Sequence, residues 1–87
     1  MDSRYRPRPH ILEEEVDDDL VLYDPSRESV TVLNTTAADI WRLCDGSLTL
    51  DEVVERLAAA YGTSAEQIRG DVARTVGRLV EEGLLEE

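Results

Sequence analysis

The sequence predicts an α+β domain in which a three-stranded antiparallel sheet is followed by three helices. Short runs rich in β-branched or aromatic residues, separated by turn formers, occupy the N-terminal part of the chain. From Asn34 onward the hydrophobic period changes from two to about 3.6 residues, as in amphipathic helices. Capping-box patterns and glycines then divide this second part into separate helices.

We expect the strands at His10–Val16, Leu20–Tyr23 and Val30–Leu33. The links between them, Asp17–Asp19 and Asp24–Ser29, are short and rich in turn formers. Because parallel neighbours need long crossovers, these links favour an antiparallel meander. Ahead of the strands, residues 1–9 combine two prolines with alternating arginines and are expected to form a flexible arm, so that the domain spans residues 10–87.

The three helices each have a start and a stop signal. Asn34, Thr35 or Thr36 can cap the first helix, which Asp45–Gly46 ends. The second begins at the capping box of Thr49 and Glu52 and stops at Tyr61–Gly62, and the third runs from the capping box of Ser64 and Gln67 to about Glu82. Apolar stripes at helical spacing face inward; they are Ala37, Ile40, Trp41 and Cys44, then Val53, Val54, Leu57 and Ala58, then Ile68, Val72, Val76, Leu79 and Val80.

Composition and charge limit the function. With 87 residues the chain is one domain, too small for a large catalytic cleft. No run is long and apolar enough to span a bilayer or to serve as a signal peptide, and the single cysteine agrees with a reducing compartment, so a cytoplasmic protein is expected. The net charge of −11 repels nucleic acid and anionic membranes. Partners should therefore be neutral or basic, or bind at locally basic patches.

The third predicted strand, VTVL, carries neither charge nor proline, whereas the first carries Glu13, Glu14 and Glu15. Natural sheets guard their edges with charge, so an edge position for Val30–Leu33 would leave its backbone open to an added peptide strand. The alternatives are that the third helix covers this strand or that the strand order differs. An open edge would also permit a homodimer.

The third helix carries two arginines four residues apart, Arg74 and Arg78, with Gly70 and Gly77 on the flank. This face could admit a peptide backbone and pair with its carboxylates. Alternatively, these arginines pair with neighbouring acidic side chains of the same helix on a solvated surface.

The sequence favours no catalysis, cofactor or metal. His10 is the only histidine, and Cys44 falls on an apolar stripe, so no nucleophile and base pair is indicated. The run EEEVDDD lacks the loop of a calcium site, and no phosphate-binding loop is present. Two other classes stay open: a carrier protein modified at Ser47, although Gly46 interrupts its Asp-Ser-Leu signature, and a winged-helix DNA reader, which the net charge opposes.

The stretch LNTTAADIWRLCDGSLTLDEVVERLAAAYG, a strand hairpin before it and DVARTVGRLVEEGLL after it closely resemble the PqqD-like family of peptide-recognition domains. The resemblance covers roughly His10 to Leu85. It implies a winged helix-turn-helix-like fold without catalytic activity. Family members pass a ribosomally made precursor peptide to a modifying enzyme, such as a radical SAM protein in pyrroloquinoline quinone synthesis or a leader peptidase in lasso-peptide pathways.

The resemblance also implies a binding mode. The leader of the precursor pairs antiparallel with the third strand and lies between that strand and the third helix. On this chain the peptide-binding residues would be Val30, Thr31, Val32 and Leu33 of the strand, together with Val72, Arg74, Thr75, Val76, Arg78 and Leu79 of the helix, with the arginines at the rim. Our hypothesis is that this rim selects leaders bearing acidic residues.

Overall fold

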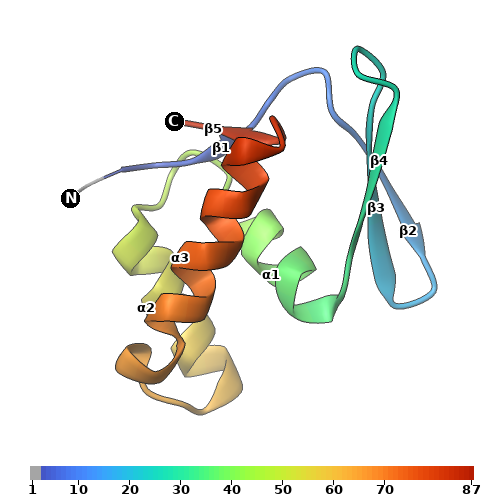
Figure 1. Ribbon diagram of the computed structural model, residues 1–87. Helices are drawn as coiled ribbons and strands as arrows, with labels where there is room; N and C mark the ends of the chain where they lie inside the picture. The colour runs from blue at the N-terminus through green and yellow to red at the C-terminus, as the bar shows by residue number, and fades with distance from the viewer. Residues whose placement is uncertain (1–2) are drawn as a thin grey trace.

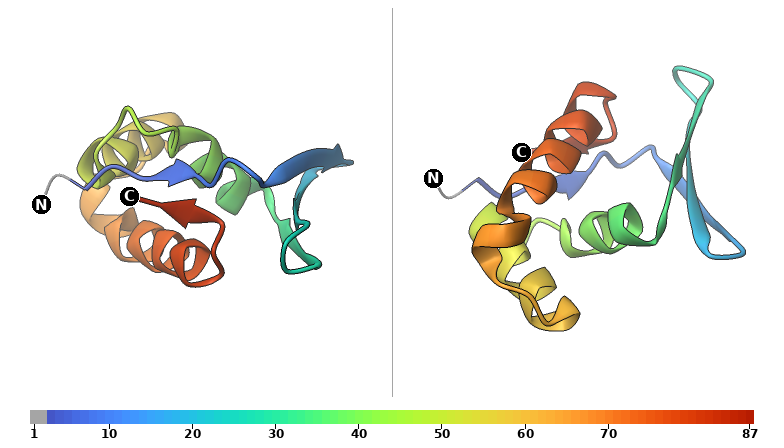
Figure 2. Two further views of the ribbon diagram at one scale, coloured as in Figure 1. Left: turned by 90° about the horizontal axis from the view of Figure 1, so that it is seen from above. Right: turned by 60° about the horizontal axis from the view of Figure 1, so that its bottom comes forward.

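The computed structural model describes residues 3–87 and has the predicted winged helix-turn-helix-like α+β architecture (Figure 1). Three strands, β2 (Leu12–Val16), β3 (Asp19–Asp24) and β4 (Ser29–Leu33), form an antiparallel sheet in the order β2-β3-β4. Three helices follow, α1 (Thr35–Leu43), α2 (Leu50–Tyr61) and α3 (Ala65–Glu81). The three helices lie on one side of the sheet (Figures 1 and 2).

The strands alternate between two faces of the sheet. Leu20, Leu22 and Leu33 point toward the helices and are at most 2% exposed. Their neighbours in sequence, including Tyr23 and Val32, point to the opposite face and are exposed. The sheet is thus an antiparallel sheet with one buried and one solvent-facing side.

The helices begin where the capping signals predict. The Asn34 side chain accepts the Ala37 N–H at 2.9 Å, and the reciprocal bonds of both capping boxes, at Thr49 and at Ser64, are present. Since Asn34 directly follows β4, this cap fixes the turn from the edge of the sheet into α1.

The core fills the space between the sheet and the helices. One buried cluster contains Trp41 and Ile40 of α1, Leu20 and Leu22 of β3, and Val76 of α3. Burial of a side chain of this size stabilises a fold by about 1.5–3 kcal/mol. The core therefore holds the sheet and α3 in a fixed relation to one another.

The flexible arm expected for residues 1–9 is corrected by the structure, although residues 1 and 2 lie outside the described part. Arg6–Pro7 form strand β1, which pairs antiparallel with β5 (Leu85–Glu86) at the C-terminus. On one side of β1, the Arg8 N–H donates to Leu84 O at 3.0 Å. On the other side, the Gly46 N–H, in the turn between α1 and α2, donates to Tyr5 O at 2.9 Å. Sequence patterning missed this because the partner strand lies about 80 residues away and is only two residues long.

No helix within residues 3–87 has the length and apolar character needed to cross a membrane.

Candidate functional site

Strand β4 forms one edge of the three-stranded sheet. It pairs with β3 from Ser29 to Leu33, and no other strand among residues 3–87 pairs with its second side. Val30 and Val32 on its outer face are 61% and 58% exposed. The alternatives that the sequence left open are thereby resolved: β4 is an edge strand, and α3 does not cover its exposed side chains.

A groove runs between this edge and α3. One hollow of about 420 Å³ is lined by residues of β4, of the start of α1 and of α3, namely Asp19, Val32, Asn34, Thr36, Ala37, Thr75 and Arg78. A second hollow of about 450 Å³ lies along α3 and is lined by Arg74, Thr75, Gly77, Arg78 and Glu81. The two hollows adjoin, since both are lined by Thr75 and Arg78, and we call them together the β4–α3 groove.

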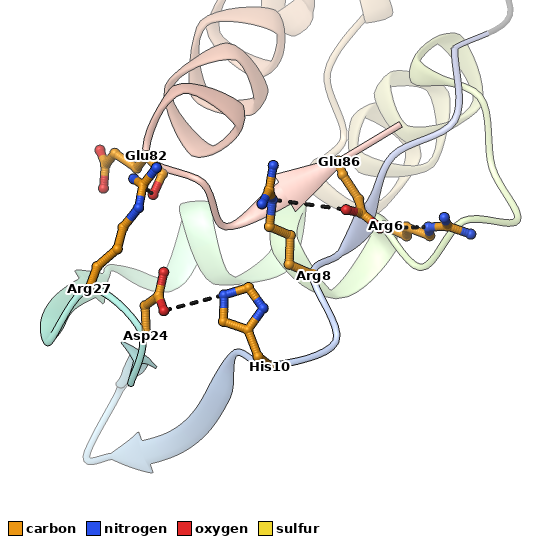
Figure 3. A network of polar contacts seen from close by, with 7 residues as sticks. All are labelled: Arg6, Arg8, His10, Asp24, Arg27, Glu82 and Glu86. Carbon is orange, nitrogen blue, oxygen red and sulfur yellow. Dashed lines mark hydrogen bonds and ion pairs between the residues drawn. The ribbon is translucent and has the colours of Figure 1, made fainter.

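Glu82, the C-cap of α3, ties β4 to the helix. Its backbone carbonyl accepts a hydrogen bond from Arg27 Nη1 at 3.1 Å (Figure 3). Its carboxylate accepts one from Thr31 Oγ1 at 3.2 Å. The other carboxylate oxygen lies 3.5 Å from Arg78 Nε. These contacts fix the strand at the C-terminal end of α3, so that the groove keeps its width there.

The β3–β4 turn is held by a buried carboxylate. Asp24 Oδ1 accepts the Ser26 hydroxyl at 2.7 Å and the Ser26 N–H at 3.0 Å, and His10 Nε2 lies 3.3 Å away (Figure 3). The hydroxyl bond from Ser26, with smaller contributions from the Ser26 and Arg27 N–H groups and from His10, holds the pKa of Asp24 below its ordinary value despite burial. The hairpin that presents β4 is therefore anchored by a charged group.

The structure brings together six of the ten predicted peptide-binding residues. Val30, Thr31 and Val32 lie on β4, and Arg74, Thr75 and Arg78 lie on the side of α3 that lines the groove.

The other four side chains, Leu33, Val72, Val76 and Leu79, are corrected: they are at most 3% exposed and belong to the core. Successive helical residues are rotated by about 100°, so the core position Val76 and the groove position Thr75 adjoin in sequence but face different neighbours. Leu33 still contributes its backbone to the edge of the sheet.

Sequence reasoning missed groove residues that directly follow β4. Asn34, Thr36 and Ala37 line the groove, although their pattern was interpreted only as a helix cap. The signal that could have found them is their position. A cap placed immediately after an edge strand must lie beside any peptide that extends along that strand.

The family model for coenzyme PQQ synthesis protein D (PqqD) matches residues 19–85, which include β3, β4 and all three helices. The chain belongs to the PqqD family. No curated protein sequence matches it significantly.

Solved structures of similar fold support this assignment. The PqqD-family chain is similar to lasso peptide synthetase B1 complexed with the leader peptide, with a TM-score of 0.85 and 27% identity over 98% of this chain and 100% of that one. It also resembles TbiB1 in complex with the TbiA(beta) leader peptide, with a TM-score of 0.82 and 21% identity over 93% and 94% of the two chains. A third likeness is to the PqqD truncation of Methylobacterium extorquens PqqCD, described as a stand-alone recognition element for ribosomally synthesised and post-translationally modified peptides, with a TM-score of 0.78 and 20% identity over 95% and 88%.

The arginine rim of this PqqD-family chain is paired with carboxylates of its own. Arg74 pairs with Asp71 and Arg78 with Glu82, at one-turn spacing on α3. Exposed pairs of this kind contribute about 0–1 kcal/mol, so an incoming carboxylate can displace them at little cost. The pairing that the sequence allowed as an alternative is therefore present, and it is compatible with binding at the rim.

The side chains that could suggest other chemistry are engaged in structural roles. Cys44 is buried, and desolvation raises the pKa of its thiol to about 11, which keeps it protonated at neutral pH. The Ser47 hydroxyl donates to Asp45 at 2.6 Å in the turn after α1. Within residues 3–87, no group of three His, Cys, Asp or Glu side chains is arranged to hold a metal ion.

Proposed function

We propose that this PqqD-family chain is a leader-peptide recognition module, which binds the leader of a ribosomally made precursor and presents it to a modifying enzyme. The observation that carries the proposal is the unpaired edge of β4 beside the β4–α3 groove. The leader complexes described for the similar structures support it. The role requires no catalysis, cofactor or metal, and work on a newly made precursor belongs in the cytoplasm.

The edge supplies affinity that does not depend on leader sequence. A leader strand laid antiparallel to β4 forms main-chain hydrogen bonds with the second side of residues 29–33, as in other cases of strand addition. In a strand, every second side chain points to the same face, so half of the leader side chains enter the groove toward Ala37 and Thr75. These contacts fix the register.

The arginine rim supplies selectivity. Arg74 and Arg78 line the groove with exposed guanidinium groups, which can form two parallel hydrogen bonds to a carboxylate. The chain as a whole is acidic, but within about 8–10 Å a local pair of cations outweighs distant charges that salt screens. We therefore expect leaders with an Asp or Glu at the position that faces α3.

The test is a titration of the ¹⁵N-labelled chain with the leader peptide of its precursor, to be identified among the neighbouring genes. Amide shifts confined to residues 29–34 and to Thr75 and Arg78 are the expected result. Two leader variants sharpen it, each N-methylated at one of two adjacent residues in the paired segment. In an antiparallel ladder only one of the two N–H groups faces β4, so only one methyl group should abolish binding. Equal affinity for both variants would refute strand addition.

A further inference from the structure

The face of the sheet that points away from the helices carries a continuous apolar surface. Strand register places Leu12, Tyr23 and Val30 in one row across the three strands, and Glu14, Val21 and Val32 in the next. Leu12 is 57% exposed and Tyr23 is 37% exposed. We call the five apolar residues of these rows the outer face; they are Leu12, Val21, Tyr23, Val30 and Val32.

No helix or strand among residues 3–87 packs on the outer face. All three helices lie on the opposite side of the sheet (Figure 2), where Leu20 and Leu22 are buried. Single exposed apolar residues are normal on a protein surface, but cross-strand rows of them usually mark an interaction site. The outer face adjoins the β4–α3 groove at Val32, whereas Leu12, Val21 and Tyr23 do not line the groove.

Acidic residues without salt bridges lie on β2 and in the β2–β3 turn, on and next to the outer face. Glu13, Glu14, Asp17 and Asp18 take part in none of the salt bridges found among residues 3–87. Glu13 and Glu14 join Leu12, Val21 and Tyr23 in lining a hollow of about 390 Å³. Such a hollow suits an arginine or lysine, whose stem packs on the apolar side chains while its charged end reaches a carboxylate.

We propose that the outer face is the docking surface for the modifying enzyme, through an apolar patch on that enzyme rimmed by arginine or lysine. This inference rests on the proposed function. It identifies a contact distinct from leader binding, which delivery requires because the leader already occupies the groove.

A second copy of the chain is a poor occupant of this surface. A two-fold contact would bring the unpaired carboxylates of both copies together, and each copy has a net charge of −11. Three strands of about five residues also present a footprint of only roughly 240 Å². A stable interface buries about 800 Å² per partner.

A bound leader enlarges the outer face. A strand added to β4 is coplanar with the sheet, so the leader side chains that do not enter the groove emerge beside Val30 and Val32. The enzyme then meets a composite of sheet and leader. Its affinity for the loaded chain therefore exceeds its affinity for the empty one, and the small footprint of the empty face permits release after modification.

The test uses the full chain with its precursor and modifying enzyme, both to be identified among the neighbouring genes. The double variant Leu12→Thr and Tyr23→Thr removes two apolar anchors that lie on β2 and β3, not on the open edge strand β4, and it keeps residues of high β-propensity. We expect its leader affinity, by calorimetry, to stay within about twofold of wild type, whereas the rate of precursor modification at low enzyme concentration falls by about tenfold or more.

Charge provides the matched control. Glu14→Gln with Asp18→Asn should lower the modification rate and weaken its dependence on salt, whereas Glu55→Gln with Glu66→Gln, the same charge change on the helices, should not.

Wild-type rates for the Leu12 and Tyr23 variant, with intact leader binding, would overturn the inference. So would a wild-type dimer in sedimentation that this variant loses, because a second copy would then occupy the face. Failure of the wild-type chain to bind the leader would instead overturn the proposed function itself.

Discussion

Strands β2 and β4 form the two edges of one sheet, yet β2 carries three consecutive glutamates whereas β4 carries no charge. Glu13 and Glu15 alternate toward the helix side, where Arg42 reaches Glu15 at 2.8 Å, and Glu14 points to the outer face. A strand that tried to pair with β2 would have to desolvate these carboxylates. The same sheet therefore has one edge closed to strand addition by charge and one left open beside a groove.

The largest effect is expected from giving β4 the charge of β2. Val30→Glu with Val32→Glu places two carboxylates on exposed positions of the open edge, where the fold tolerates them. They would repel an acidic leader and resist desolvation, and we expect leader affinity to fall by about a hundredfold, or ~2.7 kcal/mol. Calorimetry measures the change. Val30→Thr with Val32→Thr is the neutral control, and a similar loss in that control would show that the apolar side chains, not the charge, govern access.

The next effect concerns the opposite wall of the groove. Arg74→Glu with Arg78→Glu should weaken binding of an acidic leader by about tenfold, ~1.4 kcal/mol, and the difference should shrink as salt is raised. Arg56→Glu with Arg69→Glu changes the same charge at positions that do not line the groove. Equal losses from the two pairs would mean that net charge, and not the rim, controls affinity.

Sequence signals that act over a few residues predicted most of the fold, but they did not predict the pairing of β1 with β5, which joins distant segments. The capping boxes at Thr49 and Ser64 lie within four residues, so their outcome hardly depends on the rest of the chain. The pairing of Arg6–Pro7 with Leu85–Glu86 depends on where the whole domain places its two ends. The alternating arginines and prolines of the N-terminal segment therefore do not indicate which segment pairs with it.

Only part of the site was predicted, because the orientation of α3 also depends on the whole fold. The absence of charge on β4 is visible in the sequence, and it correctly suggested an open edge. Which side of α3 faces that edge is set by how the core rotates the helix. The apolar period marks Val72, Val76 and Leu79 as a stripe, and a stripe of this kind packs on the core more often than it binds a ligand. The groove therefore uses the less apolar residues beside it, Thr75 and Arg78.

A smaller effect is expected at the turn that presents the open edge. Because the pKa of Asp24 is lowered in the folded chain, its charge stabilises the fold above the unfolded pKa of about 3.9, and this contribution is lost as pH falls through the lower folded value. Asp24→Asn keeps an acceptor for Ser26 but removes the charge. Urea unfolding should give a lower midpoint for the variant at pH 7, with the two proteins converging below about pH 4. A gap that persists at low pH would indicate lost packing instead of lost charge.

The smallest effect is expected on stability, from substitutions in the turn between β2 and β3. Asp17, between β2 and β3, has a φ of 54°, a left-handed conformation that costs an L-residue about 1–2 kcal/mol and costs glycine almost nothing. Asp17→Gly should therefore raise stability by a few tenths to about 1 kcal/mol, even after the added entropy of the unfolded chain. Asp18→Gly is the matched control: it removes the same charge at a residue without positive φ and should lower stability by about 0.5–1 kcal/mol. Thermal unfolding distinguishes them, and a gain from both variants would mean that relief of repulsion within the run of three aspartates, and not backbone geometry, limits this turn.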